Sequence, residues 1–176
     1  MDKAKSCCFS GHRSVHFDMD FSHMGYVMQG ILHKAIQQAI ADGYKIFYGG
    51  LAQGFDIIAA EMVIKEKYAN PDVDLTLVSV APFRGQEAKW GQHWRSRHDE
   101  VLKASDEIVV LNESFIKGSY HERNRYLVNH ASRLIGFFSG KSSGTKHTFD
   151  LAEEKGLEIV NIWSDVQRLD PLDNLN

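Results

Sequence analysis

The chain has 176 residues, of which 43% are apolar and 24% are charged, and its formal net charge is −3. A chain of this length can bury a core as one domain without disulfides or metals. No apolar run approaches the ~20 residues that span a bilayer, and the first residues do not open a signal peptide, so we expect no membrane partner and a cytoplasmic location. The slight acidic excess also argues against a nonspecific nucleic-acid binder, so nucleic acid is not an expected partner.

Cys7 and Cys8 are adjacent in the first predicted strand. Neighbouring side chains of a strand point to opposite faces, so the two thiols cannot readily share a metal and are expected to be small buried hydrophobes. His12 and His16 are spaced as His-x-x-x-His, but both are expected in a loop rather than on one helix face, and no Cys-x-x-Cys occurs, so we predict no structural metal and no required cofactor. The histidines expected in loops or on exposed helix faces are His12, His16, His93, His98, His121 and His130.

Apolar periodicity alternates between strand-like and helix-like segments along the chain. Because the strand-like segments show little polar alternation and are separated by helices, they indicate a parallel sheet covered on both faces. Right-handed crossovers then give a single Rossmann-like, doubly wound α/β domain over residues 1–163, followed by a polar tail over 164–176. The predicted strands are 5–9, 44–48, 75–80, 107–111, 133–138 and 157–162, and the predicted helices are 25–42, 56–68, 86–103, 121–130 and 145–155.

The first predicted helix carries an apolar stripe at i, i+3, i+4 spacing and ends at Gly43, as a helix with a C-cap glycine would. The stripe consists of Met24, Val27, Ile31, Ala35 and Ala39.

Residues 48–56, Tyr-Gly-Gly-Leu-Ala-Gln-Gly-Phe-Asp, join a predicted strand to a predicted helix. Gly49, Gly50 and Gly54 allow the backbone to approach a ligand, and the first turn of the helix offers unpaired N–H groups to a phosphate. Asp56, just inside the helix, could bind a ribose hydroxyl. The alternative is a glycine-rich turn with an acidic residue that satisfies the helix dipole.

Two further loops also follow strands and carry cations. Ser10 and Gly11 precede Arg13, whose planar guanidinium can donate two parallel hydrogen bonds to a phosphate. Phe83 and Arg84 could supply an aromatic face and a second cation. The alternatives are a surface arginine on a turn, and a proline-directed turn in which Phe83 caps the core.

The last of these loops places Gly140, Gly144 and Thr145 at a helix start, but it lacks the Gly-x-x-x-x-Gly-Lys-Ser/Thr order, so ATP hydrolysis is not predicted. Arg123 and Asn124 lie in a charged helical turn that could reach the ligand or form a solvated helix face. All these loops should converge on the carboxyl edge of the sheet. The predicted ligand-binding residues are Ser10, Gly11, Arg13, Gly49, Gly50, Gly54, Asp56, Phe83, Arg84, Arg123, Asn124, Gly140, Gly144 and Thr145.

Five ordered blocks, at residues 7–13, 49–61, 82–87, 123–126 and 142–145, resemble the YpsA-type branch of the SLOG superfamily. That superfamily also includes the DNA-processing protein DprA and the LOG phosphoribohydrolases, and the resemblance covers residues 6–162. It implies a Rossmann-like fold that binds a nucleotide or a nucleotide-derived ligand such as ADP-ribose, NAD or AMP, often as a homodimer.

The chain departs from two members of that superfamily. LOG enzymes follow a Gly-Gly-x-Gly-Thr-x-x-Glu pattern, whereas here Thr148 stands where that glutamate would be. Asp56 or Glu61 could substitute for the missing carboxylate in N-glycosidic cleavage. DprA proteins hold single-stranded DNA on a basic face, and this chain has no comparable excess of lysine and arginine.

We therefore expect a sensor or sequestering protein for a nucleotide-type ligand. Arg13 and the two glycine loops would hold phosphates and Asp56 a ribose, and Phe83 would contact a base or form an apolar wall. The alternatives are an N-glycosidic hydrolase that uses Asp56 or Glu61, and a DprA-like binder of single-stranded DNA.

Overall fold

The computed structural model describes residues 2–14, 18–141 and 144–169. After a short 3-10 turn (Lys3–Lys5), six strands alternate with six helices, and all strand pairs are parallel. The strands are β1 (Ser6–Gly11), β2 (Ile46–Gly49), β3 (Thr76–Ala81), β4 (Glu107–Val110), β5 (Arg133–Phe137) and β6 (Glu158–Asn161). The helices are α1 (His23–Ala41), α2 (Phe55–Ala69), α3 (Gln92–Ala104), α4 (Ser119–His130), α5 (Gly144–Glu154) and α6 (Trp163–Leu169).

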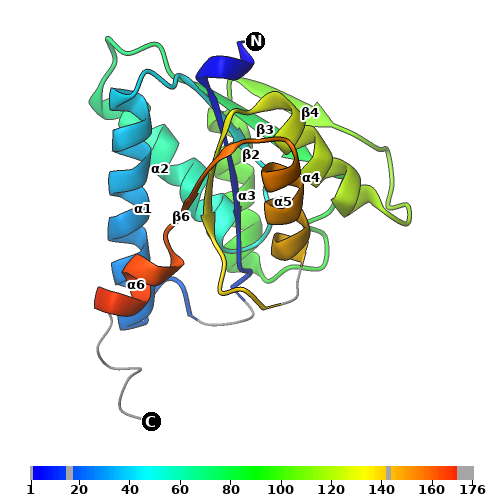
Figure 1. The fold of residues 1–176 in the computed structure, drawn as a ribbon. Coiled ribbons are helices and arrows are strands. Elements are labelled where there is room, and N and C mark those ends of the chain that lie inside the picture. The colour runs from blue at the N-terminus through cyan, green and yellow to red at the C-terminus, as the bar shows by residue number, and fades with distance from the viewer. Residues whose placement is uncertain (1, 15–17, 142–143, 170–176) are drawn as a thin grey trace.

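The strand order is β4-β3-β2-β1-β5-β6, so the side on which successive strands are added to the sheet changes between β1 and β5. The chain builds outward from β1 to β4, crosses back, and continues on the other side of β1. Helices α1, α2, α3 and α6 therefore lie on one face of the sheet, and α4 and α5 lie on the other (Figure 1). The predicted doubly wound, Rossmann-like α/β fold is confirmed.

The core consists of two apolar layers, one on each side of the sheet. Cys7 belongs to the layer beneath α1 and α2, and Cys8 to the layer beneath α4 and α5, so the prediction that the two thiols point to opposite faces is confirmed. Both side chains are fully buried, and burial raises the pKa of each thiol far above its ordinary value.

Helix α1 turns its apolar face to the core one residue away from the predicted stripe. Ala39 is fully buried as predicted, whereas the other predicted positions lie half-buried at the flank of the same layer. A Cβ on Gly25 would lie 2.5 Å from the carbonyl oxygen of Met19, so the segment before α1 packs closely on the side of the helix that carries Gly25. The buried side consists of Gly25, Met28, Leu32, Ile36 and Ala39.

Two other predicted elements differ from the structure. Helix α3 begins at Gln92 rather than at residue 86, because residues 84–90 form turns and Gly91 is the N-cap. The first part of the predicted polar tail forms α6, which packs on α1 through the buried Val166, while residues 170–176 lie outside the described residues.

The histidine prediction was wrong at His98, which lies on α3 but is only 3% exposed because its ring packs on Trp90. His12 lies in the loop after β1, as predicted, although its ring is buried among aromatic side chains. His16 lies outside the described residues.

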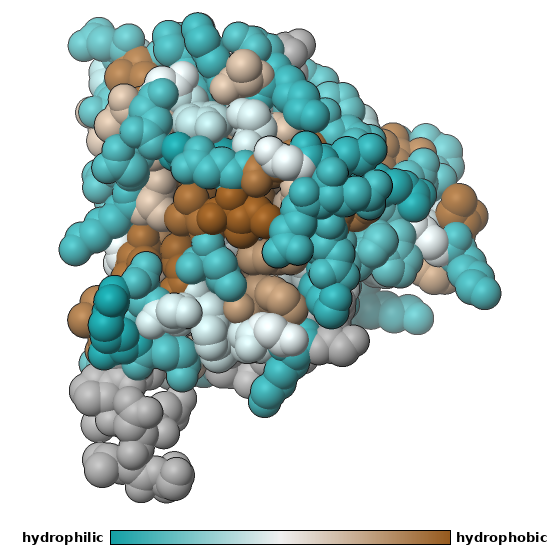
Figure 2. All heavy atoms as spheres, in the orientation of Figure 1, coloured by the Kyte–Doolittle hydropathy of each residue, from teal (hydrophilic) through white to brown (hydrophobic). Residues whose placement is uncertain are grey.

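Strand β6 forms one edge of the sheet and is covered only in part, since Ile159 and Val160 are half-buried. Figure 2 looks onto this edge and shows apolar side chains gathered in the middle of the face, between the polar surfaces of α1 and α5. Across the described segments, no helix combines the length and apolarity needed to cross a bilayer.

Candidate functional site

A cavity of about 130 Å³ opens at the carboxyl edge of the sheet, beside the reversal between β1 and β5. The loops after β1 and β5 diverge here toward opposite faces of the sheet, which leaves a crevice between them. Four separate segments of the chain contribute to its wall. The lining residues are Ser10, Gly11, Arg13, Ala52, Asp56, Tyr120, Arg123, Asn124, Gly144 and Thr145.

A buried ion pair stands at the inner end of this cavity. Asp56, in the first turn of α2, lies 4.0 Å from Nη1 of Arg123 on α4, and neither side chain is more than 6% exposed. The carboxylate of Asp56 also accepts hydrogen bonds from the backbone N–H groups of Ala52 and Gly11. Burial raises the pKa of Asp56 to about 6, against the opposing attraction of Arg123 and these two N–H groups. Asp56 thus takes up one backbone N–H group from the end of β1 and one from the loop after β2, outside the helix turn that the sequence had suggested for a ligand phosphate.

The loop after β2 makes room for Arg123. A Cβ on Gly50 would lie 2.6 Å from Nη1 of Arg123 and 2.9 Å from Oδ2 of Asp56, so this position requires glycine. Nη1 of Arg123 donates to the carbonyl oxygen of Gly50, and Nε donates to Oδ1 of Asn124 at 2.8 Å. The next residue, Leu51, is fully buried with a φ of 56°, in the left-handed region that few non-glycine residues adopt.

The outer wall of the cavity carries a second cation, Arg13, whose charge also favours the ionised form of Asp56. The guanidinium of Arg13 lies 5.3 Å from the ring centroid of Tyr120, within cation–π range. Among the residues that the structure describes, no carboxylate forms an ion pair with Arg13. The backbone of Arg13 forms an antiparallel bridge to Gly54, so the loops after β1 and β2 hold each other in place.

The start of α5 closes the cavity on the β5 side. Oγ1 of Thr145 donates to the carbonyl oxygen of Gly11 at 3.0 Å, and Nδ2 of Asn124 donates to the carbonyl oxygen of Gly144 at 3.4 Å. The backbone N–H of Ser139 donates to Nε2 of His12 at 3.0 Å. These bonds fix the loops after β1 and β5 to each other and to α4.

Eight of the fourteen predicted ligand-binding residues line this single cavity. They are Ser10, Gly11, Arg13, Asp56, Arg123, Asn124, Gly144 and Thr145. Gly50 and Gly54 adjoin the cavity through Arg123 and Arg13, whereas Gly49 is buried in β2 and Gly140 is not part of the lining.

Phe83, Arg84 and Glu61 lie elsewhere. Phe83 packs edge-to-face on Tyr120, outside the cavity, and the exposed Arg84 donates to Glu113 at 3.1 Å. Glu61 accepts from Nε of Arg97 at 2.7 Å.

A smaller hollow of about 80 Å³ adjoins the cavity and shares Arg13, Ala52 and Tyr120 with it. Its remaining wall comes from Gln53, Gln86 and Trp90, which the sequence-based site did not include. Tyr120 was also missed, because a single tyrosine before a helix has no pattern of its own. Only Gln86 had a signal in the sequence that could have assigned it to the site, because it directly follows the loop after a predicted strand.

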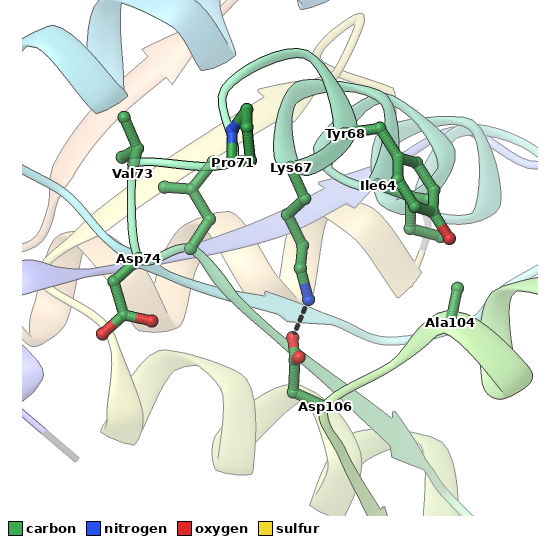
Figure 3. Close-up of a pocket in the computed structure, with 9 residues that line it drawn as sticks. Ile64, Lys67, Tyr68, Pro71, Val73, Asp74, Ala104 and Asp106 are labelled. Atoms are coloured by element: carbon green, nitrogen blue, oxygen red, sulfur yellow. Dashed lines mark hydrogen bonds and ion pairs between the residues drawn. The ribbon is translucent and has the colours of Figure 1, made fainter.

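A larger hollow, of about 430 Å³, lies at the opposite edge of the sheet, before β3 and β4 (Figure 3). Lys67 of α2 and Asp106 form an ion pair across it, and Asp106 also accepts from the backbone N–H of Leu77 at 2.7 Å. Lys67 and Asp106 are therefore engaged in holding α2 to the strands. The exposed cation and the diverging loops favour the cavity at the carboxyl edge as the functional site.

The sequence and this geometry can be compared with known proteins. The YpsA model, described as the YspA SLOG family, matches residues 7–161, which is most of the chain. The chain belongs to the YspA SLOG family. A UPF0398 protein of Halalkalibacterium halodurans is 28% identical over 139 residues, covering 78% of this chain and 72% of that protein. A UPF0398 protein of Staphylococcus aureus strain JH9 is 19% identical over 173 residues, covering 96% and 91%.

Two solved structures of DNA processing protein A (DprA) share the fold. The protein from Streptococcus pneumoniae superposes with a TM-score of 0.59 at 18% identity, covering 89% of this chain and 50% of that chain. The protein from Helicobacter pylori, whose structure is described for its single-stranded DNA binding mode, gives 0.59 at 19%, covering 89% and 64%. This chain thus spans about half to two thirds of the length of these DprA proteins.

The likeness to DprA corrects one expectation from the sequence. Net charge had argued against nucleic acid as a partner, yet the fold is shared with a protein that binds single-stranded DNA. The physical reason is that net charge averages over the whole surface, whereas a bound strand contacts only local cations. A net charge of −3 therefore does not exclude a nucleic-acid partner.

Proposed function

We propose that this protein binds a phosphate-bearing ligand of nucleotide chemistry in the cavity between β1 and β5. The observation that carries the proposal is the position of Arg13. It is a cation without an ion-pair partner among the described residues, on the wall of a cavity at the strand-order reversal. A planar guanidinium in such a place suits a phosphate, and the start of α5 opposite it adds a positive dipole end.

The buried pair of Asp56 and Arg123 supports binding rather than cleavage. N-glycosidic hydrolysis needs a carboxylate that is free to meet the reacting sugar. Asp56 accepts two backbone N–H groups beside Arg123, and Glu61 is paired with Arg97 away from the cavity. Asp56 is surrounded by partners of its own and Glu61 lies away from the cavity, so the hydrolase alternative gains no support from this arrangement.

Single-stranded DNA is the second candidate ligand, and the shared fold with DprA favours it. A strand and a free nucleotide present the same phosphate chemistry to Arg13. The roles of sensor or sequestering protein, the homodimer, ADP-ribose as the ligand and the cytoplasmic location stay predictions.

Calorimetric titration of the purified protein with AMP, ADP-ribose, NAD and a ten-nucleotide single strand tests the proposal. We expect at least one of them to bind the wild-type protein and to lose most of its affinity in Arg13→Ala. Arg84→Ala is the matched control, because Arg84 is an exposed arginine paired with Glu113 outside the cavity. Absence of binding by every ligand, or equal loss in both variants, would refute the proposal.

A further inference from the structure

The hollow beside the phosphate cavity has a wall of a different kind. It is lined by two aromatic side chains, Trp90 and Tyr120, and by two amides, Gln53 and Gln86. Arg13 and Ala52 stand between the two spaces and belong to both linings. A ligand whose phosphate is bound by Arg13 therefore has this second, smaller hollow directly beside that phosphate.

The two aromatic rings are held in place from outside the hollow. Trp90 packs edge-to-face on the buried His98 at 5.6 Å, and Tyr120 packs edge-to-face on Phe83 at 5.6 Å. Aromatic side chains in fixed positions form stacking surfaces for planar ligands, and a nucleobase offers such a surface whatever its sequence.

The orientation of the Gln86 amide is determined by its partner. Nε2 of Gln86 donates to the carbonyl oxygen of Leu51, at 3.4 Å, and a carbonyl oxygen can only accept. The amide oxygen must then lie on the other side of the group, and within the described part of the chain it accepts no hydrogen bond. Nε2 of Gln53 is likewise engaged, with Oγ of Ser14 at 2.8 Å. Gln86 thus retains an acceptor oxygen for a ligand donor, whereas the hydroxyl of Ser14 can donate or accept and does not fix the orientation of the Gln53 amide.

We infer that this hollow is a nucleobase subsite that prefers a base with an exocyclic amino group, such as adenine or cytosine. The base stacks on Trp90, and its amino group donates to the amide oxygen of Gln86. The attached phosphate lies against Arg13 in the neighbouring cavity. This inference rests on the proposed function and deepens it.

The size of the hollow restricts the class of ligand further. About 80 Å³ admits the edge of one ring and not a base pair. In a duplex both faces of a base are stacked on its neighbours, so stacking on an aromatic side chain of the hollow requires an unstacked, unpaired base. Free nucleotides and single strands satisfy this requirement, and double-stranded nucleic acid does not.

The experiment compares bases on the wild-type protein, so it does not depend on any variant folding. Affinities are measured by calorimetry for AMP, CMP, UMP and ribose 5-phosphate, and for ten-nucleotide strands of deoxyadenosine and of deoxythymidine. We expect AMP and CMP to bind about tenfold more tightly than UMP and ribose 5-phosphate, within the range of one well-placed hydrogen bond to a base. Adenine strands that outcompete AMP, with a steep salt dependence, would identify the strand as the source of the base.

Two variants test whether the preference for AMP over UMP arises in the hollow. Gln86→Met has a side chain of similar length without the acceptor oxygen, so the preference of AMP over UMP should disappear while ribose 5-phosphate binds as before. Gln92→Met is the control, because Gln92 is exposed at the start of α3 and donates to Ser96. Equal affinities for AMP, UMP and ribose 5-phosphate in the wild type, or a preference unchanged in a folded Gln86→Met, would overturn the subsite and leave the phosphate site standing. Failure of every ligand, ribose 5-phosphate included, would overturn the proposed function itself.

Discussion

Arg123 and Asp56 face each other inside the protein, with 4.0 Å between the guanidinium Nη1 and the carboxylate Oδ2. Desolvation dominates at both groups: burial raises the pKa of Asp56 to about 6 and lowers the pKa of Arg123. Each shift opposes the charged form, so the attraction between the two charges offsets only part of the cost of burying them. The pair is better explained by its position in the cavity than by a gain in stability.

Removing one member of this pair should destabilise the protein far more than removing both. Arg123→Met leaves the carboxylate of Asp56 buried without its cation, which should lower the free energy of unfolding by about 3–5 kcal/mol. The double variant Asp56→Asn with Arg123→Met should recover part of that loss. Urea unfolding of the wild type and the three variants at pH 7.5 measures the coupling energy, and additive effects would contradict a direct interaction.

Ligand affinity should rise as the pH falls through 6. Asp56 is ionised above its pKa of about 6 and neutral below it, so at pH 5.5 the cavity has one negative charge fewer than at pH 7.5. An anion should then bind severalfold more tightly at the lower pH. The measurement should use two nucleosides joined by one phosphodiester, because that group keeps its charge of −1 over the whole range.

Asp56→Asn serves as the control for this pH dependence. It removes the titrating carboxylate and leaves His121 and His147 of the neighbouring helices unchanged, so any contribution of those histidines persists in the variant. The affinity of Asp56→Asn should vary little between pH 5.5 and 7.5. A variant as pH-dependent as the wild type would assign the effect to other groups.

Arg13 should account for most of the ligand affinity. Loss of a hydrogen bond to a charged group costs about 1.5–3 kcal/mol, so Arg13→Ala should weaken binding by about 10- to 150-fold. Arg13→Lys keeps the charge and loses the planar fork, and it should show an intermediate affinity. Calorimetry on the folded variants provides the values, with Arg84→Ala expected to match the wild type.

Gly50 should not tolerate even a methyl group. The added Cβ would displace Arg123 and Asp56, so Gly50→Ala should lower the free energy of unfolding by about 1–3 kcal/mol, as overpacking does. Gly30→Ala, in the middle of α1 with no atom within 4 Å of its added Cβ, should instead raise it by about 0.5–1 kcal/mol. Thermal unfolding of both variants checks the opposite signs, and two changes of the same sign would be inconsistent with the close approach at Gly50.

The two thiols should resist modification in the folded protein. Burial raises the pKa of Cys7 and Cys8, and the thiolate is the reactive form, so an alkylating reagent at pH 8 should label neither. After unfolding in urea both should react within minutes, which mass spectrometry can follow. Rapid labelling of the native protein would show that one of the strands at the core opens readily.

Much of the site could be predicted because the carboxyl ends of parallel strands share one edge. Arg13, Asp56 and Thr145 each follow a strand, and the structure brings them to the same cavity. Loop positions in the sequence do not reveal the order of the strands. Arg84 follows β3, which lies two strands from β1, and it turns instead to Glu113.

Helix geometry explains the other differences. Glu61 lies five residues after Asp56 on α2, about 140° further around the helix, so the two carboxylates face different neighbours. Gln86 and Trp90 were assigned to a helix that starts only at Gln92, and the turns that replace its beginning bring them back to the hollow. No periodic pattern marks a turn of this kind.

Leu51 connects the strained turn after β2 with the ligand hollow. A left-handed backbone at a leucine costs about 1–2 kcal/mol, which glycine would avoid. The side chain of Leu51 packs in the apolar layer, and its carbonyl oxygen accepts a hydrogen bond from Gln86. Gln86 is thus bonded to a residue anchored in the core, so its side chain should already be aligned when a ligand arrives. The ligand should then lose little affinity to reorganisation of the hollow.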